Sequence, residues 1–159
     1  MTGPFSSESA PHRAPTEEAT AFWDWATGET LRHSGTRIEE MCEISHLSIR
    51  HYQRDNGETV TLLVISPSKT NRERVIPMSG ELFHVIASVI RRHTRDGSPV
   101  PILRRFDPHD KVWSPPMPFL FQRKIVSTRS VISPASVPSR IRPPSGPIAS
   151  GQRPEAQRG

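Results

Sequence analysis

The order of hydrophobic and polar positions predicts three helices around a short run of strands. Residues 16–34 carry a narrow, mixed stripe at helical spacing, which consists of Trp23, Ala26, Thr27, Thr30, Leu31 and Ser34. Residues 79–95 carry a stronger apolar stripe, which consists of Leu82, Val85, Ile86, Val89 and Ile90. The spacing of Ile38, Met41 and Cys42 predicts a further short helix near residues 37–44.

Between residues 47 and 77 the period shortens to two, which predicts strands. Leu47 and Ile49 alternate with polar residues and begin the first strand. Asp55-Asn56-Gly57 is a turn sequence typical of hairpins, and β-branched residues dominate the second strand at 59–65. A proline places the third strand, 74–77, at an edge. The predicted fold class is α+β, with helices packed on a small three-stranded antiparallel sheet.

Composition divides the chain after residue 96, where the regular periodicity ends. Residues 1–96 carry 11 Lys and Arg against 13 Asp and Glu, whereas residues 97–159 carry 10 against 3 and hold most of the 17 prolines. We expect a disordered N-terminus at 1–14, a folded part with regular periodicity at 15–96, a Pro- and aromatic-rich extension at 97–137 and a disordered basic tail at 138–159. A short helix is predicted to start at Ser133-Pro134 and to be stopped by the prolines that follow.

Several classes of protein are excluded by residues that the chain lacks. No apolar run approaches the ~18 residues of a membrane span, and the first 15 residues contain no apolar signal segment. The single cysteine, Cys42, rules out a disulfide framework and a cysteine-based metal site. We therefore expect a cytoplasmic protein without a metal or an organic cofactor.

Two motifs in this order resemble the first part of the catalytic domain of tyrosine recombinases, the phage integrase family. The first is HSGTRIEEMCEISHLSI at residues 33–49, and the second is SPSKTNRERVIPMSGEL at residues 66–82. The segment RRFDPHDKVWSPPMPFLFQR at residues 104–123 also resembles part of some integrases. The resemblance covers residues 14–137 and implies a partner, double-stranded DNA, and a role in DNA recombination and the integration of a mobile element.

The resemblance also implies roles for individual residues. Arg37 matches the arginine that grips the scissile phosphate, a task suited to the bidentate guanidinium group. Glu40 matches the acidic residue that supports this arginine, and Lys69 matches the hairpin lysine that protonates the leaving 5′-hydroxyl. Arg72 and Arg74 lie beside Lys69 in the sequence and are expected to contact DNA phosphates.

The later motifs of the family are missing from these 159 residues. The only tyrosine, Tyr52, lies between the two motifs, whereas the family nucleophile follows all the others. One His-x-x-Arg sequence occurs, from His51 to Arg54, but it precedes Lys69 and is interpreted as chance. We expect a truncated recombinase without strand-cleaving activity, in which oligomerisation on DNA is doubtful. A frameshift or premature stop near Val137 would explain the sequence that follows that residue.

Two further hypotheses remain open from the sequence. One is a non-enzymatic DNA-binding or regulatory protein, which would use the basic second part and residues such as Arg140 and Arg142. The other is an interaction module unrelated to DNA, which would use Phe119, Phe121 and the Pro-rich tail.

Overall fold

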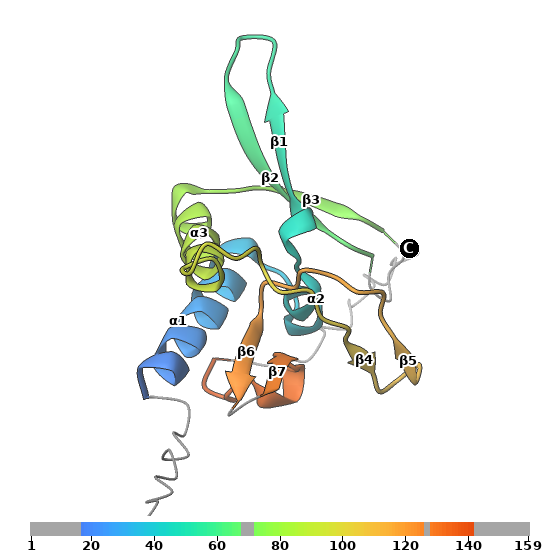
Figure 1. The fold of residues 1–159 in the computed structure, drawn as a ribbon. Coiled ribbons are helices and arrows are strands. Elements are labelled where there is room, and N and C mark those ends of the chain that lie inside the picture. Colours follow the sequence, from blue (N-terminus) through green and yellow to red (C-terminus); the bar gives the residue numbers. More distant parts are fainter. Residues whose placement is uncertain (1–16, 68–71, 126–127, 142–159) are drawn as a thin grey trace, which may run out of the picture.

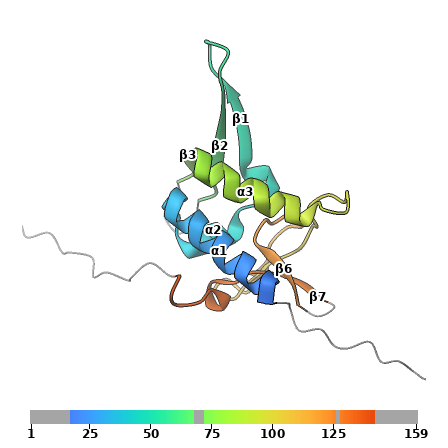
Figure 2. The same cartoon turned by 90° about the vertical axis from the view of Figure 1, so that its left-hand side faces the viewer.

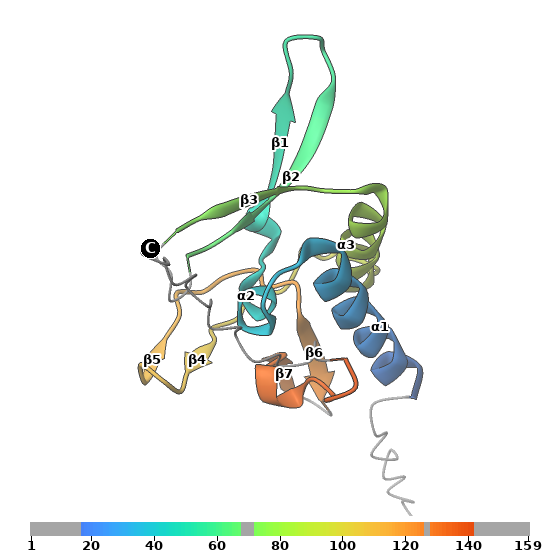
Figure 3. The ribbon, with the colours of Figure 1, turned by 180° about the vertical axis from the view of Figure 1, so that it is seen from behind.

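The computed structural model describes residues 17–67, 72–125 and 128–141 of the chain. Three α-helices belong to the first part: α1 (Glu17–Ser34), α2 (Ile38–Glu43) and α3 (Gly80–His93). Helices α1 and α3 pack against each other, and α2 lies beside α1 (Figures 1 and 3). The predicted helices are confirmed within a few residues. The predicted disordered N-terminus and nearly all of the predicted tail lie outside the described residues.

The three predicted strands form one antiparallel sheet in the order β1-β2-β3: β1 (Ile49–Gln53), β2 (Thr59–Ile65) and β3 (Arg74–Pro77). The predicted combination of helices and a small three-stranded sheet is therefore confirmed. One detail is wrong, because Leu47 belongs to the 3-10 turn η1 (His46–Ser48) and is exposed. Beyond its base, the β1–β2 hairpin projects away from the helices in all three views (Figures 1–3).

The segment after residue 97 contains two short hairpins that its sequence did not predict. They are built from β4 (Phe106–Asp107) with β5 (Val112–Trp113) and from β6 (Gln122–Ile125) with β7 (Thr128–Val131). The start predicted at Ser133 is confirmed, because Ser133 caps a single 3-10 turn, η2 (Pro134–Ser136). The elements β6, β7 and η2 lie below α2 and beside the lower end of α1 in Figure 1, on the side of the molecule opposite the projecting hairpin.

One hydrophobic core joins both parts of the chain. Phe121 is fully buried, and Leu120 is buried with it against the residues that follow α2. Phe119 is buried as well, so the hypothesis that Phe119 and Phe121 are exposed for binding a partner is wrong. The backbone N–H of Leu120 donates to the carbonyl of Ile44 at 2.9 Å, and that of His46 donates to Pro118 at the same distance. Cys42 is also fully buried, and burial raises the pKa of its thiol to about 12. The thiol therefore acts as a small apolar group within this core.

A buried histidine at the end of α3 holds the later segment in place. The Nε2 atom of His93 lies 2.7 Å from the carbonyl oxygen of Leu120, so Nε2 carries the proton and donates it. Nδ1 then accepts from the guanidinium of Arg129 in β7 at 3.4 Å, and the indole ring of Trp23 lies 5.5 Å away. Both ring nitrogens are satisfied only when the ring is neutral.

Acid is therefore expected to weaken the fold through His93. Burial, together with the charges of Arg129 and Arg92, lowers the pKa of His93 below its ordinary value of 6.5. The unfolded chain then binds a proton that the folded chain does not, so stability falls as the pH drops below about 6.5 toward the lowered pKa. Denaturant unfolding between pH 8 and pH 5 measures this slope. The slope should shrink in His93→Gln and persist in the control His109→Gln, which changes an exposed ring.

None of the helices in the part of the chain that the structure describes combines the length and the apolar content that crossing a membrane requires.

Candidate functional site

The carboxylate of Glu40 connects the two sequence motifs. Glu40 lies in α2, and only 5% of it is exposed. Its Oε2 accepts a hydrogen bond of 2.9 Å from the backbone N–H of Arg37 and forms an ion pair with the guanidinium of Arg74 in β3. Residues 34 positions apart in the sequence are thereby held at one point, where the N-terminus of α2 meets the edge strand of the sheet.

The backbone before α2 explains where Arg37 lies. Gly35 ends α1 with φ at +63°, a conformation that favours glycine, and Thr36 is buried with its hydroxyl 2.8 Å from that of Ser34. Arg37 then takes the N-cap position of α2 in an extended conformation, with φ −74° and ψ 156°. The Glu40 carboxylate satisfies the N–H of Arg37, while the Arg37 side chain stays exposed.

The resulting arrangement places an exposed arginine and a half-exposed one beside a single buried carboxylate. Arg74 keeps 46% of its side chain exposed, so its guanidinium faces both Glu40 and solvent. Arg72, which precedes β3, is exposed as well. The structure thus brings together Arg37, Glu40 and Arg74, whereas Lys69 lies outside the described residues. The guanidinium groups of exposed arginines such as these can each bind the oxygens of a phosphate.

Tyr52 and the His-x-x-Arg sequence both lie on the projecting hairpin. Tyr52 is 56% exposed and pairs with Val60 across the two strands. The His51 ring lies 3.3 Å from the Thr61 hydroxyl, and Arg54 forms an ion pair with Glu58 at 3.0 Å. The partners of both side chains therefore belong to the same hairpin, as expected if the His-x-x-Arg match is accidental.

Two arginines of the described part of the basic segment pair with acids of the first part. Arg105 contacts Glu43 at 2.8 Å, and Arg140 forms an ion pair with Asp24 of α1. Arg142, the other residue considered for DNA binding, lies outside the described residues. Arg105 and Arg140 thus attach the basic segment to the helices. The hypothesis that this segment binds DNA stays a prediction.

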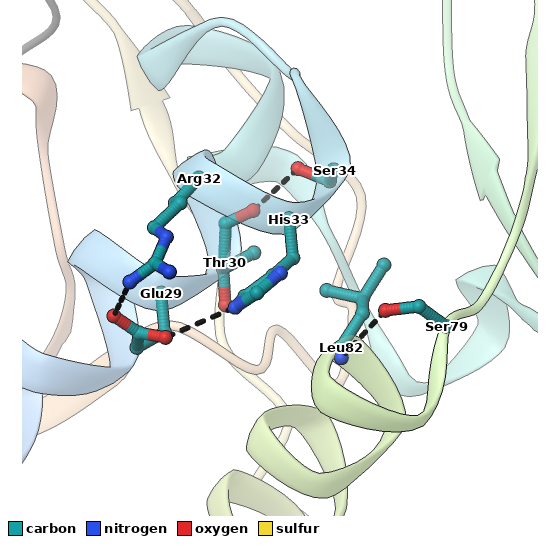
Figure 4. A network of polar contacts seen from close by, with 7 residues as sticks. All are labelled: Glu29, Thr30, Arg32, His33, Ser34, Ser79 and Leu82. Carbon is teal, nitrogen blue, oxygen red and sulfur yellow. Dashed lines mark hydrogen bonds and ion pairs between the residues drawn. The ribbon is translucent and has the colours of Figure 1, made fainter.

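A second polar cluster lies between the end of α1 and the start of α3 (Figure 4). Glu29 contacts both His33, at 3.0 Å, and Arg32, at 3.4 Å, while the Ser79 hydroxyl caps α3 by accepting from the N–H of Leu82. An open cavity of about 500 Å³ lies beside this cluster, with Trp25 and His84 on its wall. Within the described residues, no group of three or more His, Cys, Asp or Glu side chains has a geometry that could hold a metal ion.

Sequence reasoning missed the two contacts that His93 makes, although a signal was present. Residue 93 follows Val89 by four positions and Ile86 by seven, so it continues the apolar stripe of α3. A histidine on a buried stripe needs two polar partners. One of them, the Leu120 carbonyl, comes from the segment whose folding the sequence did not predict.

No known protein family matches the chain, and neither a curated protein nor a solved structure shows significant similarity to it.

Proposed function

We propose that the chain binds the phosphate backbone of duplex DNA at the Arg37–Glu40–Arg74 site, as the first part of a catalytic domain of tyrosine-recombinase type. The single observation that carries the proposal is the buried Glu40 carboxylate, which binds both the backbone N–H of Arg37 and the guanidinium of Arg74, a residue 34 positions after Glu40. We assign the activity to the cytoplasm, where a DNA substrate would be met.

The charge of the site supports a phosphate ligand. Glu40 neutralises part of the charge of Arg74, yet the side chain of Arg37 remains exposed at the first turn of α2. Arg72 adds a further exposed cation close by in the sequence. Contacts of this kind position a protein on DNA without reading its sequence. They also make the affinity depend on salt, because each neutralised phosphate releases counterions.

Strand cleavage is not part of the proposal. The only tyrosine, Tyr52, belongs to the projecting hairpin, and the His-x-x-Arg sequence beside it pairs within that hairpin. We propose that the chain occupies DNA without cutting it. A duplex with a nick near a recombination site traps a tyrosine recombinase as a covalent 3′-phosphotyrosine adduct. Formation of that adduct by this chain would contradict the proposal.

Arg37→Ala is expected to weaken DNA binding roughly tenfold, because a charge-assisted phosphate contact is lost. The slope of log K against log salt should become less steep by about 0.9, the value for one phosphate contact. Fluorescence anisotropy with a labelled random-sequence duplex, measured over a range of KCl concentrations, gives both quantities.

Arg91→Ala is the matched control for this measurement. Arg91 is exposed on α3, where its guanidinium donates to the Ser88 hydroxyl at 3.0 Å, so its removal deletes one positive charge elsewhere. The control should keep the salt slope of the unmodified chain. Equal losses of DNA affinity in the two variants would mean that the affinity depends only on net charge, and the proposed site would be wrong.

A further inference from the structure

The outer part of the β1–β2 hairpin, residues 51–61, lies beyond the pairing with β3 and is a two-stranded ribbon that covers no core. None of these residues is buried, and His51 through Thr59 are all exposed. Figures 1 and 2, at right angles to each other, both show the ribbon standing clear of the helices. A two-stranded hairpin without a packed face is only marginally stable in water. Burial of apolar side chains in the core therefore does not account for the presence of the ribbon.

The register divides the ribbon into two faces of different chemistry. His51 is opposite Thr61 and Gln53 is opposite Thr59, so one face consists of hydrogen-bonding side chains. We call these four residues the polar ribbon face. The other face consists of Tyr52 and Val60, with Arg50 and Leu62 next to them at the base of the ribbon. Its one apolar cross-strand pair, Tyr52 with Val60, helps to hold the two strands together. The Asp55-Asn56-Gly57 loop fixes the register, with Gly57 at φ +83°.

The polar ribbon face has unused hydrogen-bonding capacity. Among the described residues, its one side-chain hydrogen bond joins the His51 ring to the Thr61 hydroxyl, at 3.3 Å. The Gln53 amide offers donors and an acceptor side by side, the arrangement that pairs with the N6 and N7 edge of adenine. No acid lies on this face, and Glu58 at the turn is paired with Arg54.

The polar ribbon face and the phosphate site lie on the same side of the sheet. Arg74 is opposite Ile65, and Ile65 points to the same side as Thr61 and Thr59, since alternate residues share a face. Thr59 and Ile65 are six positions apart along β2, a distance of about 20 Å. The major groove, ~12 Å wide, admits a two-stranded ribbon. One duplex can therefore reach both Arg74 and the ribbon.

We propose that the polar ribbon face reads base edges in the major groove of duplex DNA. The inference rests on the proposed function and adds sequence specificity to it. The arginines bind phosphates, and the polar ribbon face selects the base sequence. A partner protein is disfavoured, because the polar ribbon face offers no apolar anchor and Tyr52 on the opposite face is paired across the strands with Val60.

Selection of bound sequences from a random duplex library tests this proposal, with the full 159-residue chain. The selected duplex and a scrambled one are then compared by anisotropy at one fixed salt concentration, because affinity varies with salt. The double variant His51→Ala/Gln53→Ala should lower the preference for the selected duplex roughly tenfold, while the affinity for the scrambled duplex changes less than twofold. These exposed positions contribute little to stability.

Two further variants separate the possible outcomes. Tyr52→Thr changes the opposite face with a residue that suits a strand, and it should keep the preference. Arg37→Ala should weaken binding to both duplexes equally. An unmodified chain that binds DNA without any preference, or a double variant that keeps the full preference, would overturn the ribbon proposal alone. A chain that binds no duplex at all would overturn the proposed function and this inference together.

Discussion

Replacing Phe121 with alanine is expected to lower the free energy of unfolding by about 3–5 kcal/mol, the usual cost of removing a buried phenyl ring. Phe121 is fully buried in the core shared by both parts of the chain. Its neighbour Leu120 is hydrogen bonded through the backbone to Ile44. The loss should therefore affect the helices as well as the later hairpins. Urea denaturation followed by far-UV circular dichroism measures the change.

Phe106→Ala is the matched control, since the same side chain is removed from the same segment at a site that is 44% exposed. We expect it to cost about 1 kcal/mol or less, mainly through loss of the ring contact with Trp113, whose centroid is 5.2 Å away. Similar losses in the two variants would mean that Phe121 does not belong to the cooperative core.

Replacing Glu40 with alanine is the second change with a large expected effect. The substitution removes the buried carboxylate that binds the N–H of Arg37 and the guanidinium of Arg74. Breaking a buried pair costs about 3–5 kcal/mol when the remaining charge stays buried. Arg74 is 46% exposed and can be rehydrated, so we expect a loss nearer about 2 kcal/mol. Thermal or urea unfolding at pH 7 measures the change.

Glu39→Ala is the control for Glu40→Ala, because it removes the same charge from the exposed side of the same helix. Its effect should stay within about 0.5 kcal/mol. DNA affinity provides a second measurement, because the Arg74 guanidinium is no longer held in place by the Glu40 carboxylate in this variant. If both variants unfold alike, Glu40 does not link α2 to β3.

The first part of the fold was predictable because its elements are local. Residues 59–65 and 74–77 became strands with the predicted bounds, and the stripe of α3 matches its buried face. The Asn-Gly turn also fixed the hairpin that joins β1 to β2. Each of these signals lies within a window of a few residues. Neighbouring strands then pair in chain order, which requires no long-range information.

The later segment was not predictable because its contacts are with distant residues. Phe119 to Gln122 are four consecutive buried residues, which fit neither a helix nor an alternating strand. They are buried because they run beside the chain that leaves α2, as shown by the bridge from Ser45 to Phe119. The strands β4 and β5 are two residues long each, too short for a period to be recognised.

The candidate site was predictable only in part. Resemblance, rather than spacing, assigned a supporting role to Glu40 and a phosphate contact to Arg74. Nothing in the sequence indicates that these two side chains meet, since 34 residues separate them. The role assigned to Lys69 stays a prediction. The polar ribbon face follows from the register of β1 and β2, which turns alternate residues such as His51 and Gln53 to one side.

The backbone bonds between the late segment and the chain after α2 set the time at which a growing chain can complete its fold. The backbone groups of Ile44 and His46 lack these hydrogen-bond partners until Leu120 and Pro118 are synthesised, more than 70 residues later. At ~5–20 residues per second, helices and sheet emerge from the ribosome several seconds before their core can close. Met41 and Cys42 are fully buried in the finished core, and part of that core is missing during this interval, so we expect the nascent chain to be prone to aggregation until the late segment is added.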